Sequence, residues 1–261
     1  MITSIHNPRI KAARKLADRK ERYAAGMLLA GGGRVIADGV QCGMGPGAVF
    51  YDPEAVEANP AAAALLATLA GAGTDCQPCT PEVIATLTTT VTPQGIVAIL
   101  PLPLNLPFQT PLTFALILDA IRDPGNAGTL LRSAAAAGVQ AVIFGPQTVD
   151  PFNDKVLRAG MGAHFRVPLR ICATWEQVRR ILGSGPGLYL AEADAQLAYD
   201  QVDWRTPCAL VVGGEASGAG APARAESTAI AIPMHSGVES LNAAVAGSVI
   251  LFEAARQRRW G

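Results

Sequence analysis

The chain of 261 residues is poor in aromatic side chains, in histidine and in long uncharged hydrophobic runs. Aromatic residues make up 5% of it and there are three histidines, although half of all residues are hydrophobic. We find no apolar stretch of about 18 residues that would span a membrane. The charged N-terminus also lacks the apolar core of a signal peptide. The sequence therefore predicts a cytoplasmic protein with no membrane association and a substantial core.

Cysteine is also scarce, and the odd number of five without a secretion signal argues against a disulfide framework. Cys76 and Cys79 have the spacing of a zinc half-site or a redox motif. A second pair or a nearby histidine is missing for zinc, and Thr80-Pro81 stands where a redox motif would begin a helix. We interpret the pair as two ordinary small residues at a turn, and we predict no metal site.

The net charge is zero, but its distribution is uneven. Residues 1–34 hold eight Lys or Arg against two acids, whereas residues 35–120 hold seven acids and no base. Two interpretations stay open for the basic segment, a solvated helix face or a face that contacts phosphates.

Two domains and a linker are predicted. Asn7-Pro8 is a helix start, and the pattern predicts one helix from there to about Ala24. Residues 1–100 then alternate helical and strand patterns, as in a small α/β domain. Residues 101–112 contain four prolines and no charge, and therefore form a linker. Residues 113–261 form the second domain.

The second domain alternates strands and helices. Residues 114–118 form a continuous apolar run, as expected of a strand that is buried on both faces. Thr174 and Gln177 have capping-box spacing. Together these patterns predict an α/β fold with a parallel sheet and helices on both faces. A last helix, from Ser240 to Arg258, is expected to bury residues at helical spacing: Leu241, Val245, Ser248 or Val249, and Phe252.

Asp123-Pro124-Gly125-Asn126-Ala127-Gly128 follows a predicted strand and opens a helix that carries Arg132. A glycine-rich loop at a helix start favours anions. The loop is neither a dinucleotide fingerprint nor a P-loop. The alternative is that Asn126 merely caps the helix and Arg132 is a surface residue.

Two further blocks carry polar residues beside predicted strands. Gly213-Gly214-Glu215-Ala216-Ser217-Gly218 is a glycine-rich turn with one acid, and a generic strand-to-helix turn is the alternative. Ile232-Pro233-Met234 is followed by Ser240-Leu241-Asn242, where helix capping alone is the alternative.

In this order and spacing, the three blocks resemble the SpoU/TrmH-type RNA ribose 2'-O-methyltransferases of the SPOUT class, over about residues 112–259. The resemblance implies a deep trefoil knot in the parallel-sheet domain, S-adenosyl-L-methionine as cofactor, no metal, and a homodimer that buries the last helix. Residues 1–100, through Asn7-Pro8, Gly32-Gly33-Arg34 and Pro93 to Ala98, resemble the family's substrate-binding domain. That domain has a ribosomal-protein-like (L30e-like) α/β fold.

The resemblance also implies functional residues. The implied catalytic residues are Arg132, Asn126, Glu215, Ser240 and Asn242. The implied cofactor-binding residues are Val212, Gly213, Gly214, Glu215, Gly218, Ile232, Met234, Ser240, Leu241 and Ala246. The resemblance and the excess of Lys and Arg near the N-terminus together give the candidates for contact with RNA: Arg9, Lys11, Arg14, Lys15, Arg22, Arg34, Arg132, Arg158 and Arg166.

The chain departs from the family pattern at five places: Gly31, Gly160, Gly214, Ala216 and Ala243-Ala244. One alternative is therefore an RNA-binding homologue that has lost catalysis. A nucleotide-binding oxidoreductase is a second alternative, against which the missing GxGxxG motif counts. The separate N-terminal domain favours ribosomal RNA as the substrate over transfer RNA.

Overall fold

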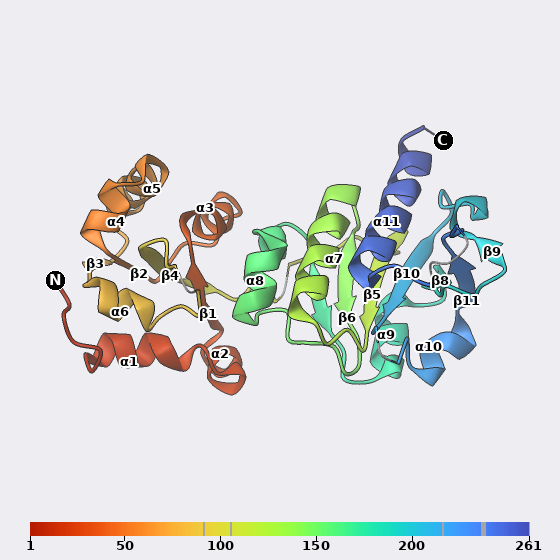
Figure 1. The fold of residues 1–261 in the computed structure, drawn as a ribbon, viewed down its shortest axis with the longest axis horizontal. Helices are drawn as coiled ribbons and strands as arrows, with labels where there is room; N and C mark the ends of the chain where they lie inside the picture. The colour runs from red at the N-terminus through yellow and green to blue at the C-terminus, as the bar shows by residue number, and fades with distance from the viewer. Residues whose placement is uncertain (91, 105, 216, 236–238, 261) are drawn as a thin grey trace. The chain divides into compact units, whose positions relative to one another are not determined.

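The computed structural model describes residues 1–90, 92–104, 106–215, 217–235 and 239–260, in two compact units (Figure 1). The first unit is Met1–Pro103 with Phe152–Phe165, and the second is Leu104–Pro151 with Arg166–Gly261. The sequence analysis placed all of residues 113–261 in one domain. Residues 152–165 belong to the first unit because their aromatic side chains pack there: the Phe152 ring lies against Tyr23.

The first unit is built on a four-stranded mixed sheet with the order β1-β4-β2-β3. Its strands are β1 (Met27–Gly31), β2 (Ala48–Tyr51), β3 (Cys76–Pro78) and β4 (Ile96–Pro101). Its helices are α1 (Pro8–Lys15), α2 (Arg19–Ala25), α3 (Gly33–Gln41), α4 (Pro53–Glu57), α5 (Pro60–Gly71), α6 (Pro81–Ala85) and α8 (Asp154–Gly160).

The single helix predicted from Pro8 to Ala24 is wrong, because the chain forms α1 and α2 with a break between them. Asp18 causes the restart: its carboxylate accepts a hydrogen bond from the Glu21 N–H at 3.1 Å and caps α2. The guanidinium of Arg22 then donates to the Leu16 carbonyl at 2.7 Å and stabilises the break.

The turn predicted at the cysteine pair is a short strand instead. Residues 76–78 pair with β2 as the edge strand β3, and Cys79 is fully buried. Burial raises the pKa of both thiols, which disfavours the reactive thiolate form. Among the described residues, no cluster of three His, Cys, Asp or Glu side chains could hold a metal ion, and no described helix is long and apolar enough to cross a membrane.

The second unit contains a seven-stranded sheet with the order β7-β6-β5-β10-β8-β11-β9, in which every pair is parallel. Its strands are β5 (Phe114–Asp119), β6 (Ala141–Phe144), β7 (Leu169–Ile171), β8 (Gly187–Ala191), β9 (Leu197–Ala198), β10 (Cys208–Gly213) and β11 (Thr228–Ala231). Its helices are α7 (Pro124–Ala137), α9 (Trp175–Leu182), α10 (Ala221–Glu226) and α11 (Ala243–Trp260).

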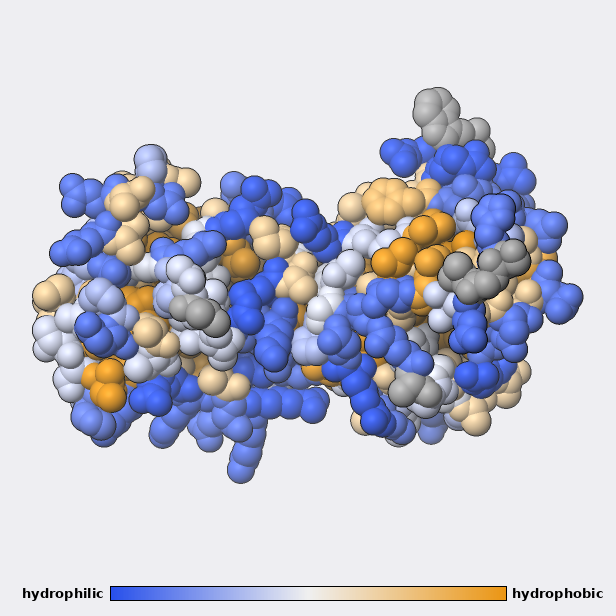
Figure 2. Space-filling view, viewed as in Figure 1, coloured by the Kyte–Doolittle hydropathy of each residue, from blue (hydrophilic) through white to orange (hydrophobic). Residues whose placement is uncertain are grey.

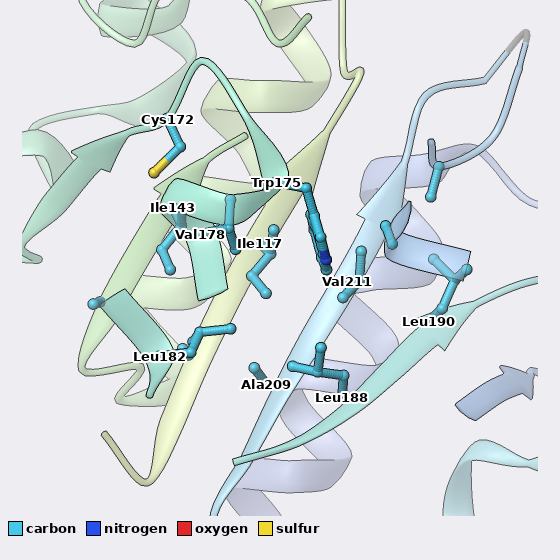
Figure 3. Close-up of a cluster of buried hydrophobic side chains, with 14 of the residues drawn as sticks. Ile117, Ile143, Cys172, Trp175, Val178, Leu182, Leu188, Leu190, Ala209 and Val211 are labelled. Carbon is cyan, nitrogen blue, oxygen red and sulfur yellow. The ribbon is translucent and has the colours of Figure 1, made fainter. Parts of the chain in front are cut away.

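Helices cover both faces of this sheet, as predicted. Figure 3 shows Trp175 of α9 over Ile117 of β5 and Val211 of β10. On the opposite face, Gly247 of α11 lies so close to Leu130 of α7 and Val212 of β10 that no side chain would fit there. The central strands are buried on both faces because their residues are apolar without alternation. The prediction of an α/β parallel-sheet fold is therefore confirmed.

The last helix differs from the prediction in two ways. It begins at Ala243, so Ser240 and Leu241 lie before it. The stripe expected to be buried is exposed instead: Leu241 is 37% exposed, Val245 49%, Val249 38% and Phe252 45%. The face that packs in this chain carries Ala244, Ile250, Leu251 and Ala254.

Candidate functional site

A cavity of about 610 Å³ opens at the carboxyl ends of β8, β10 and β11. In open parallel sheets this edge is the usual place for a ligand. All ten predicted cofactor-binding residues line it: Val212, Gly213, Gly214, Glu215, Gly218, Ile232, Met234, Ser240, Leu241 and Ala246. Residues more than 30 positions apart therefore surround one space.

The loop after β10 forms one wall of the cavity and depends on glycine. A Cβ on Gly213 would overlap the Ala219 nitrogen, and a Cβ on Gly214 would overlap the Ala120 carbonyl oxygen. Ala120 itself has a positive φ of 59°. The Gly214 and Gly218 backbones pair across the loop, with N–H to carbonyl distances of 3.2 and 2.8 Å. The departure at Ala216 lies outside the described residues.

Three polar side chains from the three sequence blocks meet at the mouth of the cavity. Asn242 donates through Nδ2 to Asn126 Oδ1 and to Glu215 Oε1, both at 3.0 Å. Asn126 also donates through Nδ2 to the same Glu215 oxygen. Asn242 Oδ1 accepts from the backbone N–H groups of Ala244 and Val245, at 2.9 and 3.2 Å, and caps α11. Asn242 thus connects the start of α11 to the other two blocks.

The alternative role of Asn126 as a helix cap is wrong. Asp123 caps α7, because its carboxylate accepts from the Asn126 backbone N–H at 2.7 Å. Asn126 is the third residue of the helix, so its side chain is available to Glu215 and Asn242.

A second, smaller cavity of about 130 Å³ shares Gly214 and Glu215 with the first. Asp123, Asn126 and Ser217 also line it. The Glu215–Asn126 contact therefore lies where the two cavities meet.

Sequence reasoning missed three charged residues that also line the large cavity: Glu192, Asp194 and Arg224. Arg224 forms an ion pair with Glu192 at 2.7 Å and donates through Nε to the Ala219 carbonyl at 3.0 Å. Glu192 and Asp194 directly follow β8, and the rule that ligands bind at carboxyl ends of parallel strands would have pointed to them.

Asp119, the last residue of β5, is a buried carboxyl group next to the glycine-rich loop. Its Oδ2 accepts from the Gly220 N–H at 2.7 Å, and the side chain is 3% exposed. Burial raises the pKa of Asp119, and the bond from Gly220 opposes that shift. Asp119 thus fixes the far end of the loop that begins at Gly213.

Arg132 is not part of this cluster. It is exposed on α7, lines neither cavity, and has no hydrogen bond or ion pair to any other described residue. Six residues separate it from Asn126, which is about 9 Å along a helix. The neighbouring Ser133 bonds to Ser248 of α11 at 2.8 Å. Arg132 therefore lies beside the helix that carries the exposed apolar stripe.

The predicted RNA-contacting residues are divided between the two units, with Arg132 and Arg166 on the second and the others on the first. Lys11, Arg14 and Lys15 are exposed on α1, where Figure 2 shows hydrophilic side chains. Arg9 forms an ion pair with Asp75.

The prediction that Arg22 contacts RNA is wrong, because this side chain is 5% exposed and donates to backbone carbonyls of its own chain. Arg34 and Arg158 lie around one pocket of the first unit, whereas Arg166 is exposed in the second unit.

Comparison with protein families gives two matches. Residues 113–252 match the model of the SpoU rRNA Methylase family. Residues 7–98 match the MRM3-like substrate binding domain. Together they span both units of the chain.

Individual relatives agree with these matches. The mouse protein named rRNA methyltransferase 3, mitochondrial, is 34% identical, over 92% of this chain and 70% of its own length. The 23S rRNA (guanosine(2553)-2'-O)-methyltransferase RlmP of Bacillus subtilis is 31% identical, over 96% of this chain and 97% of its own. The SpoU methyltransferase AviRb of Streptomyces viridochromogenes, solved with AdoMet, is 27% identical, with a TM-score of 0.81 over 98% of this chain and 100% of its own.

Proposed function

The chain belongs to the SpoU rRNA methylase family, and from this premise we propose that it transfers a methyl group from S-adenosyl-L-methionine to a ribose 2'-hydroxyl of RNA. The observation that carries the proposal is the contact of Asn126, Glu215 and Asn242 at the mouth of the large cavity. A generic fold would give no reason for three separate blocks to place polar side chains there.

The large cavity fits the cofactor. Its volume of about 610 Å³ lies in the range of small-molecule sites. Ile232, Met234, Leu241 and Ile250 give it apolar walls for a flat base, and Gly213 and Gly214 add no side chains to the space. Glu192, Asp194 and Arg224 also line the cavity and supply hydrogen-bonding groups for hydroxyl, ammonium and carboxylate groups.

When bound, S-adenosyl-L-methionine supplies the sulfonium methyl group that is transferred. The residues of the chain position the reacting oxygen and help to remove its proton. We assign the small cavity to the target nucleoside, because it adjoins the large one at Glu215. Glu215 accepts the hydrogen bonds from the side-chain amides of Asn126 and Asn242 on Oε1, and no described residue forms a hydrogen bond with Oε2. This second oxygen is suited to accept a hydrogen bond from the 2'-hydroxyl.

Arg132 is assigned to the RNA phosphate, where a planar guanidinium both orients the backbone and stabilises developing negative charge. It does not reach the cavity mouth of its own chain. A homodimer provides a reason for its position. The exposed stripe of Leu241, Val245, Val249 and Phe252 is the surface that we assign to the dimer, and Arg132 lies beside it.

We assign the substrate to ribosomal RNA and not transfer RNA, because the two named relatives are rRNA methyltransferases. The substrate-binding domain is assigned to residues 1–100, the linker to 101–112 and the methyltransferase domain to 113–261, apart from residues 152–165, which pack with the first unit. The L30e-like fold, the trefoil knot and the cytoplasmic location stay predictions. The strand order supports the knot, because β10 is inserted between β5 and the earlier strand β8.

The test combines binding and transfer. S-adenosyl-L-methionine and S-adenosylhomocysteine are titrated calorimetrically into wild type and Glu215→Gln. Ribosomal RNA is then incubated with labelled cofactor, and the nucleosides are identified by mass spectrometry. We expect micromolar cofactor binding by both proteins, 2'-O-methylnucleoside from wild type, and at least tenfold slower transfer by the variant. Methylation on a base would contradict the proposal. RNA binding without cofactor binding would instead favour the inactive homologue.

A further inference from the structure

We propose that the first unit holds a second binding site, a pocket that takes one unpaired nucleotide of the RNA substrate. The inference rests on the proposed function, since it takes RNA as the substrate. The pocket has a volume of about 150 Å³ and lies where β1 meets α3, beside the segment 88–97 and α8. It is separate from the two cavities around Glu215.

The floor of the pocket is apolar. Val35, Ile84 and Val97 line it and are at least 94% buried, while Met161 is 42% exposed. An apolar lining that includes a thioether fits the face of a base, which any unpaired nucleotide presents. The small volume selects a single base and not a helical segment of RNA.

Polar groups surround this floor. Thr88 Oγ1 donates to Thr90 Oγ1 at 3.1 Å, and both hydroxyl groups line the pocket with the exposed amide of Gln94. Hydroxyl and amide groups provide both donors and acceptors for the edge of a base. The space also depends on Gly32, whose φ is +95°: a Cβ there would lie 2.8 Å from Gln94 Oε1.

Two guanidinium groups line the same pocket and suit the phosphate of the nucleotide. Arg34 is 74% exposed and contacts Asp38 through Nε at 3.3 Å, so its two terminal nitrogens face solvent. Arg158 contacts Asp154 and donates to Thr89 at 2.9 Å, both through one nitrogen. Each side chain is thus held in place and retains donors for an anion.

The rest of the first unit supports RNA as the occupant. Residues 1–34 carry eight Lys or Arg side chains and two acidic ones. Lys11, Arg14 and Lys15 of α1 are exposed. Such an excess attracts a polyanion before any specific contact forms. An apolar floor, a polar edge and two phosphate ligands in one small pocket are then the elements of single-strand recognition.

The experiment uses the full chain and deproteinised 23S ribosomal RNA as the probe. Two variants test the pocket: Arg34→Gln removes a phosphate ligand, and Thr90→Trp fills the space for the base. Arg180→Gln is the matched control for the first, because Arg180 is also 74% exposed and pairs with an acid at i,i+4 spacing. Thr68→Trp, at an exposed position of α5, is the control for the second. RNA affinity is measured at several salt concentrations, and cofactor affinity by calorimetry.

We expect each pocket variant to bind the RNA about tenfold more weakly, with cofactor affinity unchanged and both controls like wild type. Arg34→Gln should also reduce the salt slope by about one, whereas Thr90→Trp should leave it unchanged. Ultraviolet crosslinking of wild type, read by mass spectrometry, should place a nucleotide on residues 31–35, 84–97 or 158–161.

Wild-type RNA affinity in both pocket variants, with crosslinks elsewhere, would overturn the pocket while methyl transfer persists. Failure of wild type to bind RNA or transfer methyl would overturn the proposed function, and the pocket with it.

Discussion

Asn242 and Asn126 are 116 residues apart in the sequence, yet the Nδ2 of Asn242 donates to the Oδ1 of Asn126 at 3.0 Å. Asn242 reaches this position because it caps α11, and Asn126 because Asp123 takes over the capping of α7. Glu215 accepts hydrogen bonds from both amides. The geometry of the candidate site thus follows from how two helices begin.

Asn242→Asp separates the two roles of this residue. Aspartate caps a helix as well as asparagine does, so we expect the thermal stability to stay near that of wild type. A carboxylate would, however, replace the amide that donates to Glu215, and two like charges would face each other there. Cofactor affinity or transfer rate should fall at least tenfold. Asn242→Ala is the comparison, which should also lose about 1 kcal/mol of unfolding free energy. Full activity in Asn242→Asp would contradict the assigned contact.

Gly214→Ala should disable the glycine-rich loop. The added Cβ would overlap the carbonyl oxygen of Ala120, which is backbone and cannot move aside cheaply. We expect the loop to shift and cofactor affinity, measured by calorimetry, to fall at least tenfold. Gly185→Ala is the control, because nothing lies within 4 Å of the corresponding position. Equal affinities in the two variants would show that the loop path is not needed for binding.

Val249→Glu should dissociate the proposed dimer. The substitution places a charge in the exposed stripe on α11, where Val249 is 38% exposed. We expect sedimentation to show a dimer for wild type and a monomer for the variant, with circular dichroism unchanged. Ala70→Glu adds the same charge to an exposed position of α5 and should leave the dimer intact. If wild type were monomeric, the proposal that the stripe forms a dimer interface would be wrong.

Asp119 should make stability fall as pH rises. Burial raises its pKa in the folded chain, so the folded state holds the proton more tightly than the unfolded state. Its contribution to stability is therefore present below the ordinary carboxyl pKa of about 4 and is lost as pH rises through the folded pKa. Asp119→Asn retains an oxygen acceptor for Gly220 and does not titrate.

Urea unfolding at several pH values measures this contribution. The unfolding free energy of wild type minus that of Asp119→Asn should decrease from pH 4 upwards. Asp203 is the control, because the hydrogen bond from Arg205 lowers its pKa and its contribution to stability should therefore change with pH in the opposite direction. Its contribution should be lost as pH falls below about 4. A pH-independent difference for Asp119 would show that its carboxyl group is not destabilised when charged.

The parallel sheet could be predicted from local signals, whereas the cavity residues were implied by the resemblance of the three polar blocks to the SpoU/TrmH family. Continuous apolar runs mark strands that are buried on both faces, and the three polar blocks each follow a strand. The departure at Gly214 also has a structural reason, since Ala120 leaves no room for a side chain. Arg224 could not be found in this way, because it lies in α10 and only the fold brings it to Glu192, with which it pairs.

The break between α1 and α2 and the exposure of α11 were predicted incorrectly for different reasons. Asp18 is a common N-cap residue in a segment that is otherwise helical, and a cap inside a helical pattern is easily overlooked. On α11, the apolar spacing was recognised, but spacing does not indicate whether a stripe faces the core of its own chain or another molecule. In this chain Ala244, Ile250, Leu251 and Ala254 pack inward, whereas Val245, Val249 and Phe252 stay exposed.

Arg132→Lys tests whether the reaction needs a guanidinium. Lysine keeps the positive charge but loses the planar fork that binds two phosphate oxygens at once. Arg132 is exposed and has no described partner within its own chain, so the substitution should leave folding and cofactor affinity unchanged. If the fork aligns the ribose for transfer, kcat on ribosomal RNA should fall about 10²-fold, the loss typical of one misplaced electrostatic donor. Arg180→Lys, on an exposed arginine of α9 that pairs with Glu176 and lines neither cavity, is the matched control. Full turnover by Arg132→Lys would limit Arg132 to a general charge, and the alignment would then belong to Asn126, Glu215 and Asn242.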